Sequence, residues 1–271
     1  MFPFTQTSVV LNGVPLTMLH HENAVVGGLL RSGRVSSEVL DFLSRVIEPG
    51  SRVLDAGANI GSTALFLAKV EPTATIYCFE PDPLNFSLLN LNIALNQVPR
   101  VYTFNFALGQ EERLIQLYRN GVNHGDHRSS PPMQTDMDAP RFRPLPVPVQ
   151  MVNPTDFFRR MGGDHTASQF DLVKIDTQGA DFAILEACLP LLHANSTVVV
   201  EYSPYHLYRN GTQKEDVERI AGRFSSMEIL TPMGNPQRTD PVTMDLVLAS
   251  YDTYSREWIG HSDLVFKQLK A

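Results

Sequence analysis

Strand-like and helix-like patterns of apolar residues alternate along most of the chain. Short apolar runs rich in β-branched and aromatic residues predict strands at 51–55, 75–80, 101–107, 170–175 and 197–201. Between them, apolar residues recur at helical spacing over 36–47, 63–68, 83–96 and 182–192. This alternation is typical of an α/β fold with a doubly wound, mostly parallel sheet, helices on both faces and right-handed crossovers.

Two segments in the first half depart from this alternation. Residues 1–35 mix short apolar runs with turn residues, which predicts an N-terminal cap segment before a main domain at 36–250. Residues 119–148 lack periodicity and become rich in proline. Because a long irregular segment inside a compact domain is usually functional, we expect a lid or acceptor loop, flanked by strands at 113–118 and 147–152.

The last third of the chain predicts the remaining elements of the sheet. A helix at 213–224 is expected to open with a capping box of Thr212 and Glu215. Strands are expected near 227–231 and 244–250. Residues 251–271, with Trp258, Leu264, Phe266 and Leu269, are expected to form a C-terminal tail that packs on the body or on a partner.

The most informative stretch joins the strand at 51–55 to the helix after it, and reads Asp55-Ala56-Gly57-Ala58-Asn59-Ile60-Gly61. Glycines in such a turn allow the backbone to approach a ligand closely, and the helix start offers unpaired N–H groups. A dinucleotide fold would carry G-x-G-x-x-G, and an acid before the turn fits a pyrophosphate poorly. Although an ordinary strand–helix turn is the alternative, we expect a ligand that carries an ammonium or sulfonium charge.

A second acid, Glu80, ends the next strand and precedes Pro81. A carboxylate at this place in a nucleotide-binding fold accepts the ribose hydroxyls. The alternative role, capping the following helix, is better served by Asp82 ahead of Pro83. Ala107 and its neighbours, at the end of the third strand, are then expected to border a flat base.

Asp176 and Glu201 end the fourth and fifth strands, so four strand-terminal acids are expected along the carboxyl edge where ligands bind in open α/β sheets. Neighbouring strands lie about 5 Å apart. Two carboxylates at such a short distance from each other either share a proton, which raises one pKa, or hold a divalent cation such as Mg²⁺ between them. A helix-capping role for Asp176 is an equal alternative.

The 119–148 segment contains His124, Asp126 and His127, which resemble metal ligands only loosely. Solvated loop side chains are the favoured interpretation, and no residue is assigned to a metal.

Composition and charge limit the kinds of partner that we expect the protein to bind. The formal net charge is −7 at pH 7, and without a Lys/Arg cluster to meet phosphates we expect a small-molecule or peptide-like acceptor and no nucleic acid. A membrane span needs about 18 consecutive apolar residues, which the chain lacks. The N-terminus does not resemble a signal peptide, and the two cysteines, Cys78 and Cys188, lie in apolar elements, so a cytoplasmic setting is expected. Homo-oligomerisation is left open.

These motifs together resemble the FkbM-type methyltransferases, a branch of the S-adenosylmethionine-dependent class I methyltransferase fold, which is Rossmann-like. The matching segments are Val53–Gly61, Tyr77–Pro81, Asn105–Gly109 and Leu172–Asp181. The resemblance implies a seven-stranded sheet with one antiparallel edge strand, and methyl transfer, often to a hydroxyl in natural-product or sugar chemistry. It also implies a cofactor site formed by Asp55, Gly57, Asn59, Gly61, Glu80, Pro81, Asn105, Ala107 and Asp176. The family usually has acids at the positions of Gln178 and Asp181.

A hydroxyl acceptor needs a base to remove its proton, and we expect Asp176, Glu201 and His206 to carry the catalysis. His124, His127, Gln178 and Tyr205 are expected to contact the acceptor. N-methylation of a small-molecule or peptide-like acceptor is one alternative. A second alternative is an NAD-type dehydrogenase, although the chain lacks the G-x-G-x-x-G turn that would support it. A third is a non-catalytic nucleotide-binding protein.

Overall fold

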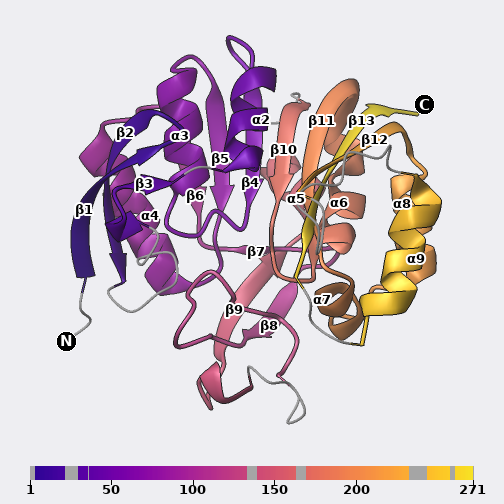
Figure 1. The fold of residues 1–271 in the computed structure, drawn as a ribbon. Coiled ribbons are helices and arrows are strands. Elements are labelled where there is room, and N and C mark those ends of the chain that lie inside the picture. Colours follow the sequence, from indigo (N-terminus) through magenta and orange to yellow (C-terminus); the bar gives the residue numbers. More distant parts are fainter. Residues whose placement is uncertain are drawn as a thin grey trace. The chain divides into compact units, whose positions relative to one another are not determined.

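The computed structural model describes residues 4–21, 30–35, 37–132, 139–162, 169–231, 243–256 and 260–270. Its largest sheet has seven strands (Figure 1), in the order β12 (Phe224–Thr231), β13 (Ser262–Leu269), β11 (Leu192–Tyr202), β10 (Phe170–Ile175), β4 (Arg52–Ala56), β5 (Thr75–Phe79) and β6 (Val101–Phe104). The pairs β4–β5, β5–β6 and β10–β11 are parallel, and β13 is antiparallel to both its neighbours. The predicted α/β class with a mostly parallel sheet is confirmed.

The chain divides into two compact units. The first comprises residues 1–107 and 113–151, and the second comprises residues 108–112 and 152–271. In the part of the chain that the structure describes, no helix has both the length and the apolar character that crossing a membrane requires.

Three helices of the first unit follow the predicted pattern: α2 (Glu38–Val46), α3 (Ser62–Val70) and α4 (Pro83–Asn96). Ser37 caps α2 and accepts a hydrogen bond from the N–H of Leu40. Asp82 caps α4 and accepts from the N–H groups of Leu84 and Asn85, with Pro83 in the first turn. The predicted capping role of Asp82 is therefore confirmed.

The N-terminal segment contains a hairpin of β1 (Phe4–Leu11) and β2 (Val14–His21). Two asparagines of α4 bind the backbone of β2. Asn92 accepts from Leu19 N (2.6 Å) and donates to Leu19 O (3.0 Å), and Asn96 makes the same pair of bonds with Thr17. The two amides thus take the place of a neighbouring strand and hold the hairpin on the helix.

We expect Asn92→Ala to lower the free energy of unfolding by about 2–4 kcal/mol. Asn92 is fully buried and also donates to Ile60 O (2.8 Å), so its loss leaves several buried backbone groups without partners. Denaturant titration measures the effect. Asn90→Ala, on the exposed side of the same helix, is the matched control and should cost less than about 1 kcal/mol. Equal losses in the two variants would contradict the bridging role.

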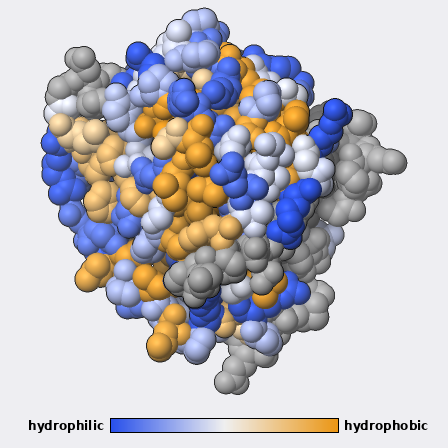
Figure 2. All heavy atoms as spheres, turned by 90° about the vertical axis from the view of Figure 1, so that its left-hand side faces the viewer, coloured by the Kyte–Doolittle hydropathy of each residue, from blue (hydrophilic) through white to orange (hydrophobic). Residues whose placement is uncertain are grey.

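The face shown in Figure 2, on the side where β1 and β2 lie in Figure 1, gathers apolar side chains. Exposed large apolar residues of the first unit include Phe4 in β1 and Leu91 and Leu95 in α4. Contiguous apolar surface of this kind often marks an interaction site.

The third predicted strand, 101–107, is too long. β6 ends at Phe104, and Ala107 begins a separate strand, β7 (Ala107–Leu108), in a small sheet with β9 (Val147–Val152) and β8 (Arg113–Leu117). Between the two strands, Asn105 donates its side-chain amide to the carbonyls of Glu80 (2.8 Å) and Pro81 (3.0 Å). The strands expected on either side of the 119–148 segment are confirmed as the antiparallel pair β8–β9.

The strand predicted at 244–250 is wrong, because these residues belong to helix α9 (Met244–Tyr254). Thr243 caps this helix, and Val247, Leu248 and Tyr251 are its buried residues. With Met244 they recur at the i, i+3, i+4, i+7 spacing of a helix, a period that the strand interpretation overlooked.

The C-terminal residues form an internal strand instead of a tail. β13 lies between β11 and β12, and its Leu264, Val265 and Phe266 are completely buried. The implied antiparallel edge strand is therefore wrong in position: the antiparallel strand is β13, and the edge strand next to it is β12. Trp258 lies outside the described residues.

Three further helices of the second unit differ from prediction mainly at their ends: α5 (Pro154–Met161), α6 (Asp181–Cys188) and α8 (Lys214–Ala221). A fourth, α7, spans Pro204–Arg209. The capping box of α8 uses Gln213 and Asp216, one residue later than the predicted pair Thr212 and Glu215. Helix α7, which the sequence did not predict, follows β11 directly.

Candidate functional site

The turn after β4 adopts the left-handed conformation that its glycines predicted. Gly57, Asn59 and Gly61 have φ values of 78°, 52° and 95°. The N–H groups of Gly57 and Ala58 both donate to Phe79 O, at 2.9 and 3.0 Å, so the turn wraps the end of β5. A Cβ at Gly61 would lie 2.6 Å from a terminal methyl group of Leu89, so an alanine there would both displace that side chain and adopt a strained left-handed backbone.

Glu80 is held in place at this turn. Its carboxylate is 5% exposed and accepts hydrogen bonds from Asn59 N (2.8 Å) and Asp82 N (2.9 Å), one on each oxygen. These two hydrogen bonds fix the orientation of the carboxylate at the turn. The first unit thus brings together the predicted residues Gly57, Asn59, Glu80, Pro81 and Asn105, with buried Asp55 just before the turn. Ala107 instead packs with Leu117 and Val149 in the small sheet.

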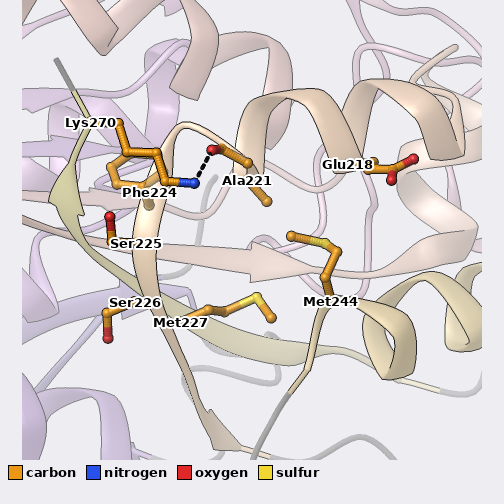
Figure 3. Close-up of a pocket in the computed structure, with 9 residues that line it drawn as sticks. Glu218, Ala221, Phe224, Ser225, Ser226, Met227, Met244 and Lys270 are labelled. Atoms are coloured by element: carbon orange, nitrogen blue, oxygen red, sulfur yellow. Dashed lines mark hydrogen bonds between the residues drawn. The ribbon is translucent and has the colours of Figure 1, made fainter.

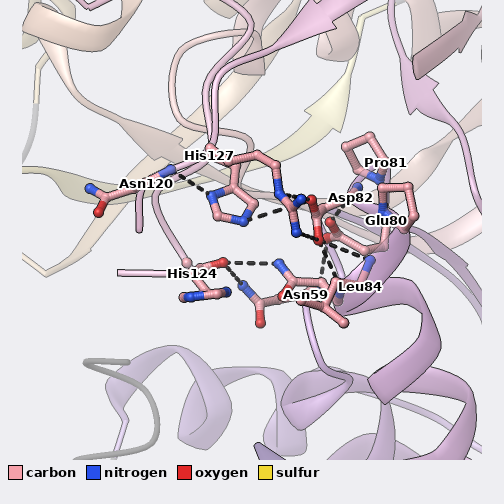
Figure 4. A network of polar contacts seen from close by, with 12 residues as sticks. Asn59, Glu80, Pro81, Asp82, Leu84, Asn120, His124 and His127 are labelled. Carbon is pink, nitrogen blue, oxygen red and sulfur yellow. Dashed lines mark hydrogen bonds and ion pairs between the residues drawn. The ribbon is translucent and has the colours of Figure 1, made fainter. Parts of the chain in front are cut away.

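The first part of the 119–148 segment is tied to the same turn (Figure 4). The carbonyl oxygen of His124 accepts from the side-chain amides of Asn59 (3.0 Å) and Asn85 (2.9 Å). Arg119 forms an ion pair with Asp82, with 2.7 Å between Nε and Oδ2. The sequence did not identify Asn85, Asp82 or Arg119 as parts of this network. Residues 133–138 of the segment lie outside the described residues.

The histidines of this segment are buried, so their interpretation as solvated loop side chains is wrong. His124 is 9% exposed, and its ring stacks on the ring of His21 with centroids 3.7 Å apart. The His127 side chain is 6% exposed, and its Nδ1 accepts from the N–H of Asn120 (3.1 Å). In a neutral ring this bond places the proton of His127 on Nε2.

The pKa values of these rings favour the neutral form. Burial, followed by the charges of His21 and His127, lowers the pKa of His124 to about 3. Burial also lowers the pKa of His127 to about 4, although Asp82 acts in the opposite direction, and it lowers the pKa of His21. Three uncharged imidazoles therefore meet beside the Asp82–Arg119 pair at neutral pH.

We expect the stability of the protein to fall as the pH drops from about 6.5 towards about 4. In this range an unfolded histidine is protonated, whereas buried His124 and His127 are not, so the unfolded state binds more protons. The contribution is complete above the unfolded pKa and is lost as the pH falls. Denaturant unfolding across this range measures the slope. His124→Gln should make the slope shallower, and an unchanged slope would contradict the burial of a neutral ring.

In the second unit, the turn after β10 brings two predicted acids together through Gln178. The side-chain nitrogen of Gln178 donates to Asp176 Oδ1 (3.0 Å) and to both oxygens of Glu201 (2.9 and 3.1 Å). Lys174 Nζ lies 3.5 Å from Asp176 Oδ2. The sequence analysis missed Lys174, although a lysine two residues before Asp176 in an apolar strand points to the same face of the sheet.

Asp181 fixes the backbone of the same turn. Its carboxylate accepts from Thr177 N (2.7 Å), Thr177 Oγ1 (2.9 Å) and Gly179 N (2.8 Å). Gly179 has φ 118°, and a Cβ there would lie 2.5 Å from the carbonyl oxygen of His206. Helix α7, which carries buried Tyr205 and His206, therefore packs directly on this turn.

The three acids have different charge states. Burial raises the pKa of Asp176, but the charge of Lys174 and the hydrogen bond from Gln178 outweigh it, so this pKa lies below its usual value. Burial, followed by the charges of Asp176, Asp181 and Asp263, raises the pKa of Glu201 well above its usual value. Burial and Asp176 raise the pKa of Asp181 to about 6. At neutral pH Asp176 is therefore ionised, whereas Glu201 holds its proton more tightly than an ordinary glutamic acid does.

Among the described residues, no group of three or more His, Cys, Asp or Glu side chains is arranged to hold a metal ion. A pocket in the second unit (Figure 3) is lined by Glu218, Ala221, Gly222, Phe224, Ser225, Ser226, Met227, Met244 and Lys270. None of these is a predicted site residue.

Comparison with known proteins adds independent findings. The model of the methyltransferase FkbM domain family matches residues 55–226, more than half of the chain. The chain is 27% identical over 145 residues to Methyltransferase 1 of Beauveria bassiana, covering 50% of this chain and 57% of that protein. It is 25% identical over 183 residues to the 2-O-methyltransferase NoeI of Sinorhizobium fredii, covering 65% and 71%.

The chain spans less than two thirds of the lengths of two curated relatives: 57% of Methyltransferase 1 and 59% of Methyltransferase sdnD of Sordaria araneosa, to which it is 26% identical over 161 residues. A 52-residue stretch is 40% identical to the 31-O-demethyl-FK506 methyltransferase FkbM of Streptomyces tacrolimicus, covering 19% of this chain and 20% of that protein. Among solved structures, an S-adenosylmethionine-dependent O-methyltransferase from Thermotoga maritima aligns with 11% identity and a TM-score of 0.47, covering 100% of this chain and 79% of that one.

Proposed function

Because the chain belongs to the FkbM methyltransferase family, we propose that it transfers a methyl group from S-adenosylmethionine to a hydroxyl of a small, natural-product or sugar-like acceptor. The observation that carries this proposal is the network around Glu80, whose fixed carboxylate faces a glycine turn of left-handed backbone. The hydroxyl is supported by the names of two relatives, a 2-O-methyltransferase and a 31-O-demethyl-FK506 methyltransferase.

The residues of the turn fit the cofactor. The fixed carboxylate of Glu80 suits the two ribose hydroxyls, because they are donors at a fixed spacing and its two oxygens are acceptors. Asp55 places a negative charge before the turn, which suits a ligand with a positive charge better than one with a pyrophosphate. Gly57 and Asn59 complete the proposed binding residues, and their backbone conformation keeps side chains away from the ligand side of the turn.

When bound, S-adenosylmethionine supplies a methyl group on a sulfonium centre that is also its leaving group. The protein must then hold the acceptor, exclude water and remove one proton from the attacking hydroxyl. Asp176 is the proposed base, because its pKa lies below the usual value whereas that of Glu201 lies above it, and because its side chain is 43% exposed. The hydroxyl proton passes to an oxygen of Asp176, and Lys174 balances the charge of this carboxylate before the transfer.

We expect Glu80→Gln to weaken the binding of S-adenosylmethionine by about 1–3 kcal/mol, since it removes the charge from two hydrogen bonds to the ribose. Isothermal titration calorimetry measures the change. Glu38→Gln, which alters an exposed acid of the same unit, is the matched control and should bind like the parent. Unchanged affinity in Glu80→Gln would mean that the ribose is held elsewhere.

A further inference from the structure

Gln178 occupies a fixed position between two carboxyl groups. Its backbone is left-handed, with φ 57°, a conformation that few residues other than glycine adopt. The flanking residues hold it there, because the N–H groups of Thr177 and Gly179 both donate to Asp181. Gly179 in turn lies against the carbonyl of His206, so the turn has little room to move.

The side chain of Gln178 can only donate hydrogen bonds at its nitrogen, and it carries no charge. This one nitrogen lies within 3.1 Å of oxygens of both Asp176 and Glu201. Two carboxylates held this close cannot both be ionised without a large electrostatic cost, and one of them keeps its proton.

The surrounding charges decide which acid keeps the proton. Asp176 has the cation Lys174 at 3.5 Å. Glu201 faces Asp176 and Asp181 across the turn, and its partner on the antiparallel strand β13 is another acid, Asp263. The exposed His261 lies 3.6 Å from Glu201, at the start of β13. Glu201 therefore faces three acids and a single nearby group that can become positive, His261. The proton accordingly stays on Glu201.

We propose that Gln178 is a positioning residue whose neutral amide holds Asp176 and Glu201 together with a single negative charge, located on Asp176. Because the amide adds no charge to the cluster, it leaves one carboxylate as base. Only the use of that base rests on the proposed function, whereas the charge distribution is a property of the folded chain.

Carbon-13 NMR of the side-chain carboxyl groups, recorded from about pH 2 to about pH 9 so that the titrations of both acids are covered, tests this directly. Signals are assigned by their loss in Asp176→Asn and Glu201→Gln. In the parent, Glu201 should give the signal of a protonated acid at neutral pH and Asp176 that of a carboxylate. Glu201 ionised at neutral pH, or both acids ionised together, would overturn the proposal.

Three variants then test the role of Gln178. Gln178→Glu should raise the apparent pKa of Asp176 by about 1 unit or more, because a third acid joins the pair. Gln178→Met, which keeps the length but donates no hydrogen bond, should raise it by a smaller amount. Gln268→Glu is the matched control, since Gln268 is exposed and has nearly the same φ, 58°. The same Asp176 titration in the parent, Gln178→Glu and Gln178→Met would overturn the proposal.

The inference about the charges of the two acids and the proposed methyl transfer can be contradicted independently of each other. If no hydroxyl is methylated while the two acids titrate as described, the function fails and the inference is supported. If methyl transfer occurs while the titration of Asp176 is the same in the parent and in the Gln178 variants, the inference fails and the proposed function still stands.

Discussion

Asp176→Asn is expected to lower the turnover of the acceptor about 100-fold or more, while S-adenosylmethionine binds with close to the parent affinity. An asparagine keeps the shape of the side chain and can still accept the hydrogen bond from Gln178, but it cannot take the proton of the hydroxyl. Turnover measured at saturating acceptor, with calorimetry of the cofactor, separates chemistry from binding.

Asp171→Asn is the matched control for this change. Asp171 lies on β10, the strand that ends just before Asp176, but its partner is His193, at 3.0 Å, and its side chain is 46% exposed. This variant should turn over like the parent. If Asp176→Asn and Glu201→Gln both turn over like the parent, the base lies elsewhere, and His124 or His127 becomes the next candidate.

Gly179→Ala is expected to lower the free energy of unfolding by about 2–4 kcal/mol. The added Cβ meets a main-chain carbonyl, that of His206, which cannot rotate away as a side chain would. We also expect a loss of turnover of about 10-fold or more, because moving this turn also moves the neighbouring Gln178.

Gly211→Ala separates the clash from the cost of a left-handed alanine. Gly211 has φ 89° in the same unit, and a Cβ added there would have no atom within 4 Å. Its substitution should cost about 1 kcal/mol and leave turnover unchanged. If the two alanine variants are equally stable, the close approach of α7 to the Gly179 turn does not constrain the fold.

The sequence predicted best those features of the site that depend only on residues close together in the chain. The turn at 57–61, the acid Glu80 after β5 and the cap Asp82 all follow from residue types within one strand–helix unit. Glycine supplies a left-handed backbone, and a short acid before proline caps a helix, whatever the rest of the chain does. These features need no knowledge of tertiary contacts.

The features that the sequence missed depend on contacts between distant residues. His124 looked like a solvated loop residue because its partners, His21 and Asn85, lie far away along the chain. The sequence also did not show that the amide of Gln178 binds Asp176 and Glu201, because Glu201 belongs to the next strand. The sequence contains no signal for such pairings until the sheet order is known.

The position of β13 in the sheet was missed for the same reason, because it depends on contacts between distant residues. Its apolar residues predicted only that the C-terminal segment would pack on something, and insertion between β11 and β12 is decided by long-range strand pairing. Helix α9 is different, since the spacing of Met244, Val247, Leu248 and Tyr251 already contained the helical period.

Calorimetric titration of the protein with S-adenosylmethionine, S-adenosylhomocysteine and NAD tests the central claim most directly. Binding of the first two, weakened in Glu80→Gln and unaffected in Glu38→Gln, together with no binding of NAD, is the result that a methyltransferase site at the Asp55–Gly61 turn predicts. Binding of NAD without either adenosyl ligand, or no binding of any of the three, would contradict it.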